Sequence, residues 1–232
     1  EFDIGWVLSY VIMYTDINQA LEHFKNILEG QLERIANTDT TKTDFTTKKQ
    51  VIIGVLDGDG IGPIITEHAY NVLKVLLADE IEAGSIVLKQ INGLTIENRI
   101  ACNQPIPTDV LAEIKTCDVL LKGPTTTPHG GTMESANVAM RRELDLYANC
   151  RPVCIPEQNI DWMFYRENTE GEYVLGSKGL ELPGMAVDFK VTTDMGTRRI
   201  VRAAFEYAKN NGKNHVSVVT KANIMKKTDG KF

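Results

Sequence analysis

The amino-acid sequence predicts an α/β fold in which a wound, mostly parallel sheet carries helices on both faces and is followed by a second α/β subdomain. Three observations support this prediction. Apolar runs of strand length recur at residues 51–58, 86–91 and 118–123. Stretches with helical periodicity separate these runs, and such β-α-β alternation is typical of a largely parallel sheet. After about residue 150 the pattern changes to strand-like segments divided by glycine-rich turns.

The first strand and helix of the sheet give the clearest signals. Residues 51–58 form a continuous apolar run that ends in a Gly/Asp turn, as expected of a strand buried on both faces. Pro63 suits the first turn of a helix, and apolar residues then recur at helical spacing from residue 65 to residue 76. A short helix is expected between residues 107 and 116.

The second half of the chain is expected to contain a long helix over residues 194–210, with Gly212 placed to end it. A further strand is expected over residues 214–223. Three earlier strands are expected at CRPVCIP, DWMFYRE and GMAVDFKVTT.

The first fifty residues differ from the rest of the chain. Apolar positions in residues 16–35 have helical spacing, with Asp16 as a candidate N-cap. The following residues, up to 50, have the polar, Thr- and Lys-rich composition of a linker. The chain therefore divides into three predicted parts: 1–50, a helical extension and linker; 51–150, which holds most of the sheet; and 151–232, the second subdomain.

Composition limits the classes of function. The net charge of −6 and the pI of about 5.3 argue against nucleic-acid binding, which usually needs a basic face. Residues 4–14 are too few to span a bilayer and lack the features of a secretory signal. Cys150 and Cys154 would share one side of a strand, too near each other for an ordinary disulfide, so we expect reduced cysteines. A cytoplasmic protein with no membrane partner is predicted, and a first residue of Glu suggests a start further upstream.

Two glycine-rich segments are candidate ligand loops. DGDGIGP (57–63) lacks the third glycine of a dinucleotide fingerprint and the GK[ST] ending of a P-loop, so a tight strand-to-helix turn is the favoured interpretation. KGPTTTPHGG (122–131) leaves a strand at the sheet edge where α/β proteins place ligands. Its hydroxyls and backbone amides could hold a ribose or a carboxamide, and an ordinary surface loop is the alternative. A single loop histidine such as His129 is usually just solvated.

The most informative stretch is ESANVAMRRELDLYANCRPV (134–153). Asn137 and Arg141 are four residues apart and share a helical face, and Ser135 lies near the N-terminus of that helix, which favours anions. Arg151 begins the next strand, and Arg166 comes from DWMFYRE. Taken singly, each arginine suits a surface salt bridge, but the set could bind a substrate with two or three carboxylates.

Tyr173 and Lys221 are ambiguous when considered alone. A strand tyrosine is usually packed and a strand-end lysine is usually solvated, but either could act as an acid–base group. Taken in order, five segments resemble the β-decarboxylating family of isocitrate and isopropylmalate dehydrogenases over residues 51–232, most closely its isocitrate dehydrogenases. These segments are DGDGIGP, LKGPTTTPHGG, ESANVAMRRELDLYANCRPV, FYRENTEGEY and TKANIMKKTDG.

The resemblance implies an isopropylmalate dehydrogenase-like fold and a role for each matching residue. Tyr173 and Lys221 match the family's acid–base pair: Lys221 would assist removal of the hydroxyl proton and Tyr173 would reprotonate the enol carbon. NAD or NADP would accept the hydride, and Mg²⁺ or Mn²⁺ would stabilise the enolate. The substrate-carboxylate positions correspond to Ser135, Asn137, Arg141, Arg151 and Arg166, and the nicotinamide positions to Thr126, Thr127 and Asn223.

The resemblance also implies a partner and a substrate. The lysine motif is contributed across a dimer interface in this family, so a homodimer with a shared active site is expected, with 51–150 contributing the cofactor loop and 151–232 the dimerisation part. Ser135-x-Asn137 resembles the isocitrate enzymes, whereas isopropylmalate enzymes carry an apolar patch there. Homoisocitrate and tartrate relatives, and a non-catalytic isocitrate-binding regulatory subunit, remain alternatives.

One departure from the family concerns the end of the chain. The family's metal-binding aspartates and adenosine loop follow the position of TDGKF, where this sequence stops. Asp188, Asp194 and Asp229 do not match the metal positions, so no metal ligand is assigned. We therefore expect a C-terminally truncated chain with an incomplete fold, inactive by itself.

Overall fold

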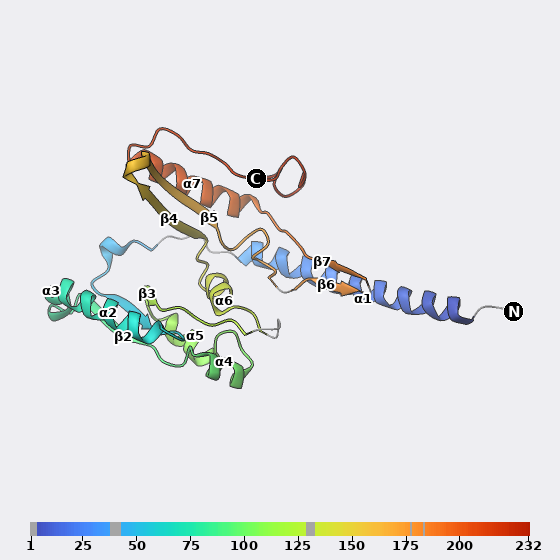
Figure 1. Ribbon diagram of the computed structural model, residues 1–232, viewed down its shortest axis with the longest axis horizontal. Helices are drawn as coiled ribbons and strands as arrows, with labels where there is room; N and C mark the ends of the chain where they lie inside the picture. Colours follow the sequence, from blue (N-terminus) through green and yellow to red (C-terminus); the bar gives the residue numbers. More distant parts are fainter. Residues whose placement is uncertain (1–3, 38–42, 129–132, 177, 183) are drawn as a thin grey trace.

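The computed structural model describes residues 4–37, 43–128, 133–176, 178–182 and 184–232, with side chains from Ile17 onward. The chain forms a body built on a three-stranded sheet, a second body built on a strand hairpin and a long helix, and an N-terminal helix that runs beside a smaller hairpin (Figure 1). Parallel and antiparallel strands are therefore segregated along the chain.

The first body contains a three-stranded parallel sheet. Strand β1 (Val51–Leu56) lies in the centre, between β2 (Ile86–Gln90) and β3 (Val119–Lys122). The last half of β1 is buried, as its uninterrupted apolar sequence predicts. The three apolar runs are thus confirmed as neighbouring strands, and the predicted α/β fold with a parallel sheet is confirmed with them.

Five helices belong to this body in the described part of the chain. Helix α2 (Gly62–Leu76) has Pro63 in its first turn, and α5 (Thr108–Ile114) occupies the predicted short segment. Helices α3 (Ala78–Glu82) and α4 (Ile96–Cys102) were not expected from the sequence. The core joins these elements to α6 (Ala136–Glu143) through Leu56, Ile91, Leu94, Ile106, Val110, Ile114, Ala136, Ala139 and Met140.

The second body is an antiparallel hairpin covered by a helix (Figure 1). Strands β4 (Ala148–Ile155) and β5 (Ile160–Glu167) are joined by the 3₁₀ turn η2 (Pro156–Gln158). Helix α7 (Asp194–Asn210) has the predicted bounds, and its Tyr207 ring lies 5.6 Å from that of Tyr165 on β5. Gly212 follows the helix with a φ of +64°, the left-handed conformation that suits a helix end.

The predicted strand over residues 214–223 is wrong. Residues 214–221 have no regular secondary structure, residues 222 and 223 lie in a turn, and Val219 is 92% exposed. A run of β-branched residues favours a strand, but the strand forms only where the edge of another strand is available for pairing. GMAVDFKVTT forms only a short strand, β7 (Met185–Val187), which pairs with β6 (Leu180–Leu182).

Helix α1 (Ile4–Asn37) corrects the prediction for the N-terminus. Asp16 lies inside this helix and is not an N-cap, because the apolar residues before it continue the helix. The helix packs against the segment around β6 and β7: Ile27 is buried with Val174 and Leu175, and the Phe24 ring stacks on Phe189 at 5.4 Å. Residues 38–42 of the predicted linker lie outside the described residues, and a 3₁₀ turn, η1 (Phe45–Thr47), follows them.

Two further predictions can be compared with the structure. The cysteines are all free. None of the described helices combines the length and the apolar character needed to cross a bilayer.

Candidate functional site

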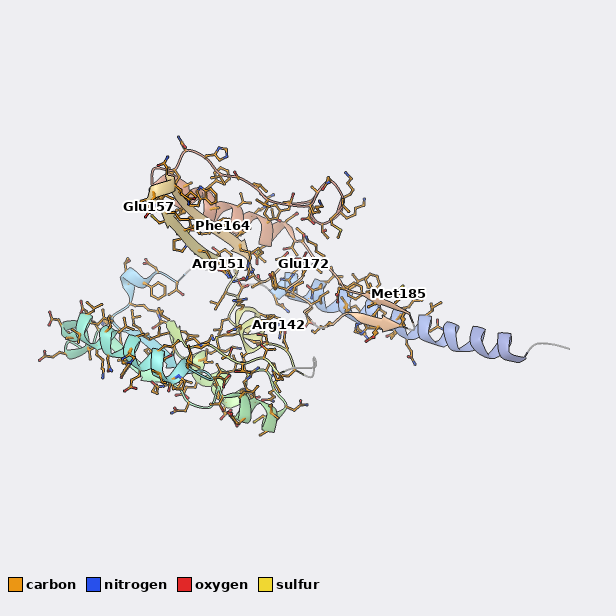
Figure 2. All side chains as sticks on the ribbon, in the orientation of Figure 1. Arg142, Arg151, Glu157, Phe164, Glu172 and Met185 are labelled. Carbon is orange, nitrogen blue, oxygen red and sulfur yellow. The ribbon has the colours of Figure 1, made fainter. Side chains whose placement is uncertain are left out.

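Three predicted arginines converge where the two bodies meet. Arg141 lies in the last turn of α6, Arg151 on β4 and Arg166 on β5, where it pairs with Asn149 across the hairpin. Figure 2 shows Arg151 near the end of the hairpin that faces α6. Burial lowers the pKa of Arg141, and the positive charges of Arg166 and Arg151 lower it further. Arginines from three elements therefore share one electrostatic environment.

The converging arginines have no acidic partner. Within the described part of the chain, no carboxylate forms an ion pair with any of the three, although other arginines are paired. Arg142, the neighbour of Arg141, donates to both carboxylate oxygens of Glu134 at 2.6 and 2.9 Å, and this contact raises the pKa of Arg142. The three clustered arginines therefore carry positive charge that no carboxylate of the described residues offsets, and such a cluster suits an anionic ligand.

Lys122 adds a fourth cation that the sequence analysis did not single out. Burial lowers the pKa of Lys122, and the nearby charge of Arg141 lowers it further, while Asp59 opposes the change. Lys122 ends β3, at the carboxyl edge of the parallel sheet, where α/β proteins bind ligands. That position is the sequence signal that could have identified it.

Tyr173 lies against Arg166. Nη1 of Arg166 donates to the Tyr173 hydroxyl oxygen at 3.1 Å, and the guanidinium carbon lies 5.0 Å from the centre of the ring. Nη2 of Arg166 donates to Asn168 at 3.0 Å, and its Nε is buried without a partner among the described residues. Because the Tyr173 oxygen accepts from Arg166, its own proton stays available to a ligand.

Helix α6 presents the two small polar residues of the predicted set. Ser135 is its N-cap, and the hydroxyl makes no capping hydrogen bond, which leaves it available. Asn137 Oδ1 accepts a hydrogen bond from the Thr125 hydroxyl at 3.3 Å. The loop after β3 is thus joined directly to the helix that carries Arg141.

Thr126 and Thr127 lie exposed on this loop, as a role in ligand contact requires. The backbone N–H of Thr126 donates to Asp59 at 2.7 Å, so this amide is not free for a ligand. His129 lies outside the described residues. The predicted cofactor loop therefore offers threonine hydroxyls more than backbone donors.

DGDGIGP is a structural turn, as its sequence favoured. Gly58 has a φ of +74°, and a side chain there would overlap the carbonyl oxygen of Pro124. The N–H of Asp59 donates to that same oxygen at 2.7 Å. The glycines allow the turn to approach the loop after β3, which explains them without a bound phosphate.

Lys221 precedes a turn over residues 222–224 that contains Asn223, and both residues are exposed. The backbone N–H of Lys221 donates to Asp229 at 3.1 Å; Asp229 pairs with Lys190 at 2.8 Å, and Lys190 pairs with Glu172 at 3.1 Å. The structure does not join either side chain to the arginines of its own chain.

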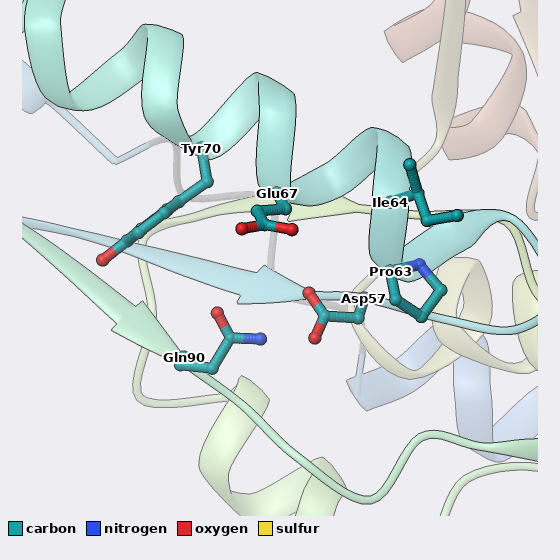
Figure 3. A pocket seen from close by; sticks show the side chains of 6 residues that line it. All are labelled: Asp57, Pro63, Ile64, Glu67, Tyr70 and Gln90. Atoms are coloured by element: carbon teal, nitrogen blue, oxygen red, sulfur yellow. The ribbon is translucent and has the colours of Figure 1, made fainter.

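A surface pocket of about 280 Å³ lies apart from this site, between α2 and the ends of β1 and β2 (Figure 3). Asp57, Glu67 and Gln90 point into it, and Tyr70, Pro63 and Ile64 complete its wall. Two carboxylates do not suit a carboxylate substrate, and the pocket includes no predicted site residue.

The described residues do not fit a divalent metal. No group of three His, Cys, Asp or Glu side chains in the described part of the chain is arranged to hold an ion. Asp194 pairs with Lys231 at 2.6 Å and Asp229 with Lys190 at 2.8 Å, so two of the downstream aspartates already have cationic partners.

Comparison with known proteins places this geometry in context. Residues 52–232 match the family model described as isocitrate/isopropylmalate dehydrogenase. An NADP-linked isocitrate dehydrogenase from Caldococcus noboribetus is 37% identical, over 88% of this chain and 53% of the relative. Regulatory subunit 3 of a mitochondrial NAD-linked isocitrate dehydrogenase from Arabidopsis thaliana is 37% identical, over 78% of this chain and 47% of the relative.

The fold comparison agrees with the sequence comparison. The crystal structure of isocitrate dehydrogenase from Methylococcus capsulatus superimposes with a TM-score of 0.65 at 32% identity, covering 78% of this chain and 54% of that chain. The chain spans about half the length of the curated relatives it matches. Helix α1 and the turn η1 lie outside the residues that the family model matches.

Proposed function

Because the chain belongs to the isocitrate/isopropylmalate dehydrogenase family, we propose that it binds isocitrate and serves its oxidative decarboxylation to 2-oxoglutarate, with hydride transfer to NAD(P)⁺. The observation that carries this proposal is the convergence of Arg141, Arg151 and Arg166 without an acidic partner in the described part of the chain. Such a cluster costs free energy unless an anion offsets the repulsion.

The residues around the arginines support isocitrate over isopropylmalate. Isocitrate has a third carboxylate, and Ser135 and Asn137 present a free hydroxyl and an amide at the N-terminus of α6. Polar groups of this kind would be left without partners by an apolar substituent, which disfavours isopropylmalate. Homoisocitrate also has three carboxylates but is longer than isocitrate. It is therefore a second ligand to compare with isocitrate in the binding test.

Two residues would handle protons in the reaction. Tyr173 accepts a hydrogen bond from Arg166 and keeps its own proton for donation to the enol carbon. Lys221 would assist removal of the hydroxyl proton. Its exposed position on an unpaired segment supports a homodimer in which each chain completes the other's site.

The nicotinamide cofactor, when bound, accepts the hydride. Thr126 and Thr127 would contact it from the loop after β3, and Asn223 would lie near the nicotinamide from the lysine segment. The family's Mg²⁺ or Mn²⁺ has no ligand set among the described residues, so no step of the proposal depends on this chain holding one. A cytoplasmic location is proposed as well, because the four cysteines are free.

A regulatory, isocitrate-binding subunit is the second candidate. The similarity to the Arabidopsis regulatory subunit favours it, since that relative matches this chain at 37% identity. The presence of Tyr173 and Lys221 favours the catalytic alternative, because a subunit that only binds isocitrate has less need of an acid–base pair.

Thermal unfolding with and without isocitrate, combined with an assay for reduced nicotinamide, tests the proposal. A ligand that binds only the folded chain raises the midpoint by mass action. A shift with isocitrate supports the anion site that both candidates share, and turnover in addition supports the dehydrogenase. A cooperative transition that isocitrate leaves unchanged would refute both.

A further inference from the structure

A completely buried arginine lies beneath the predicted site. Arg99, on α4, is 0% exposed and is the largest fully buried side chain in the described part of the chain. Its guanidinium donates to the carbonyl oxygens of Pro105 at 2.9 Å, Thr126 at 2.8 Å and Glu134 at 3.5 Å. Burial of a charged group costs free energy, so this position calls for an explanation.

Two of the three acceptors of Arg99 belong to the cofactor loop and to the residue before α6. Thr126 belongs to the loop after β3, and Glu134 directly precedes Ser135, the N-cap of α6. Residues 127–133 connect these two points. One side chain therefore fixes the distance between the residue predicted to meet the nicotinamide and the residue predicted to meet a substrate carboxylate.

Asp59 binds the backbone N–H of Thr126, the residue whose carbonyl oxygen Arg99 binds. Its Oδ2 accepts from the N–H of Thr126 at 2.7 Å, and its Oδ1 accepts from the N–H of Ile96, the first residue of α4, at 2.7 Å. Asp59 is itself buried, and its N–H donates to Pro124 at 2.7 Å. Both polar backbone groups of Thr126 are thus bound by buried side chains, one acidic and one basic.

We propose that Arg99 is a positioning residue that, together with Asp59, holds the cofactor loop at a fixed distance from the substrate helix α6. The proposal rests on the proposed function, because the two points that Arg99 joins belong to the predicted cofactor and substrate residues. Arg99 touches neither ligand and acts through the backbone of Thr126 and Glu134.

A purely structural role for Arg99 is the alternative. A core that needed only volume could use an apolar side chain, since replacement of a buried ion by a hydrophobic residue is often neutral or stabilising. An arginine fork reaches three separate carbonyl groups in fixed directions, which neither methionine nor lysine can reproduce. The retained charge therefore indicates orientation of the backbone.

The test uses the whole 232-residue chain with Arg99→Met and Arg99→Lys, and with Arg202→Met on the exposed face of α7 as the matched control. Amide hydrogen exchange of Thr126 is compared with that of Val55 in the central strand, and the Kd for isocitrate is measured by titration calorimetry well below the unfolding midpoint. We expect both Arg99 variants to raise the amide exchange rate of Thr126 at least tenfold relative to that of Val55. Both variants should also raise the Kd for isocitrate at least tenfold. Arg202→Met should change neither the exchange ratio nor the Kd.

A merely structural Arg99 would behave differently. It would lower the unfolding midpoint while leaving the Thr126-to-Val55 exchange ratio and the isocitrate Kd unchanged, which would overturn the proposal. If Arg99→Met does not fold, Arg99→Lys and Asp59→Asn supply the same comparison. If the unmodified chain does not bind isocitrate, the proposed function fails, and the exchange ratio still decides whether Arg99 fixes the loop.

Discussion

Replacement of Arg141 by methionine should strengthen the ligand-free fold and weaken substrate binding at the same time. Arg141 is partly buried, has no acidic partner in the described part of the chain, and has Arg151 and Arg166 as charged neighbours. Methionine keeps much of the side-chain volume and removes the charge. The change therefore relieves repulsion and desolvation in the free chain.

Coulomb's law gives the size of the effect. For two like charges about 8 Å apart, the repulsion is roughly 0.5 to 2 kcal/mol as the effective dielectric constant falls from about 80 to about 20. Partial exposure and salt screening reduce this, so we expect the free energy of unfolding to rise by about 1 kcal/mol. Loss of a charge-assisted contact with a carboxylate costs about 2 kcal/mol or more, or roughly thirtyfold in Kd.

Arg142 provides the matched control, because it is the next residue in the same helix and is paired. Arg142→Met removes the two hydrogen bonds to Glu134 and leaves that carboxylate without its partner, so the free energy of unfolding should fall by about 1 to 3 kcal/mol. Urea unfolding and titration calorimetry measure both quantities. If Arg141→Met destabilises the free chain as Arg142→Met does, or leaves the isocitrate Kd unchanged, the account of an uncompensated anion site is refuted.

Three further changes follow from the packing and the charges. Gly123→Ala should destabilise the chain by about 2 kcal/mol in urea unfolding, because the new methyl group would overlap the Asp57 carbonyl oxygen; an unchanged midpoint would contradict this. Glu170→Gln should cost about 1 to 3 kcal/mol, because the buried carboxylate accepts from the N–H and hydroxyl of Thr193 at 2.7 and 2.9 Å and only one amide oxygen would remain to do so. Burial raises the pKa of Glu167, so the folded chain holds that proton more tightly than the unfolded chain, and stability should fall as pH rises from the unfolded pKa through the folded pKa. Glu167→Gln should remove that segment of the pH profile, and a profile identical to the unmodified chain would show that another group causes it.

Each of these changes has a control in the same chain. Gly30→Ala introduces a methyl group with no neighbour within 4 Å in the interior of α1, so it should stabilise the chain by about 0.5 to 1 kcal/mol. Glu172→Gln alters an exposed carboxylate in an ion pair with Lys190 and should cost about 1 kcal/mol at most. Glu157→Gln makes the same chemical change at an exposed turn and is the matched control for Glu167→Gln.

Much of the fold was predictable because local signals and packing agree. The uninterrupted apolar run of β1 implies a strand with neighbours on both sides, and the structure places β2 and β3 there. The bounds of α7 were predictable because Thr193 caps its start and a left-handed Gly212 follows its end. These elements depend on residues close in the sequence.

The wrong predictions depend on residues far away in the sequence. The segment 214–223 has strand composition but no partner strand in the described part of the chain, and no local pattern reveals the presence of an edge. Asp16 has the chemistry of an N-cap, but the helix continues on its N-terminal side. Helix α4 escaped detection because its main tertiary contacts come from Arg99, a charged residue that periodicity of apolar residues does not count.

The predictions for the site also divide into those that nearby residues supported and those that depend on the packing of distant segments. The arginines were singled out from residue type and spacing, and Tyr173 through its match to the acid–base pair of the family; the structure adds the hydrogen bond between Arg166 and Tyr173. Lys122 was missed because a strand-end lysine is usually solvated, and its proximity to Arg141 comes from the packing of α6 on the sheet. The roles of Lys221 and Asn223 stay predictions, since their side chains contact no other predicted residue of this chain.

The most direct test of the anion site is calorimetric titration of the unmodified chain with isocitrate and, separately, with isopropylmalate. We predict saturable binding of isocitrate that weakens as salt increases, is lost in Arg166→Met, and is at least tenfold tighter than binding of isopropylmalate. Equal affinity for the two ligands, or isocitrate binding that survives Arg166→Met, would contradict the account.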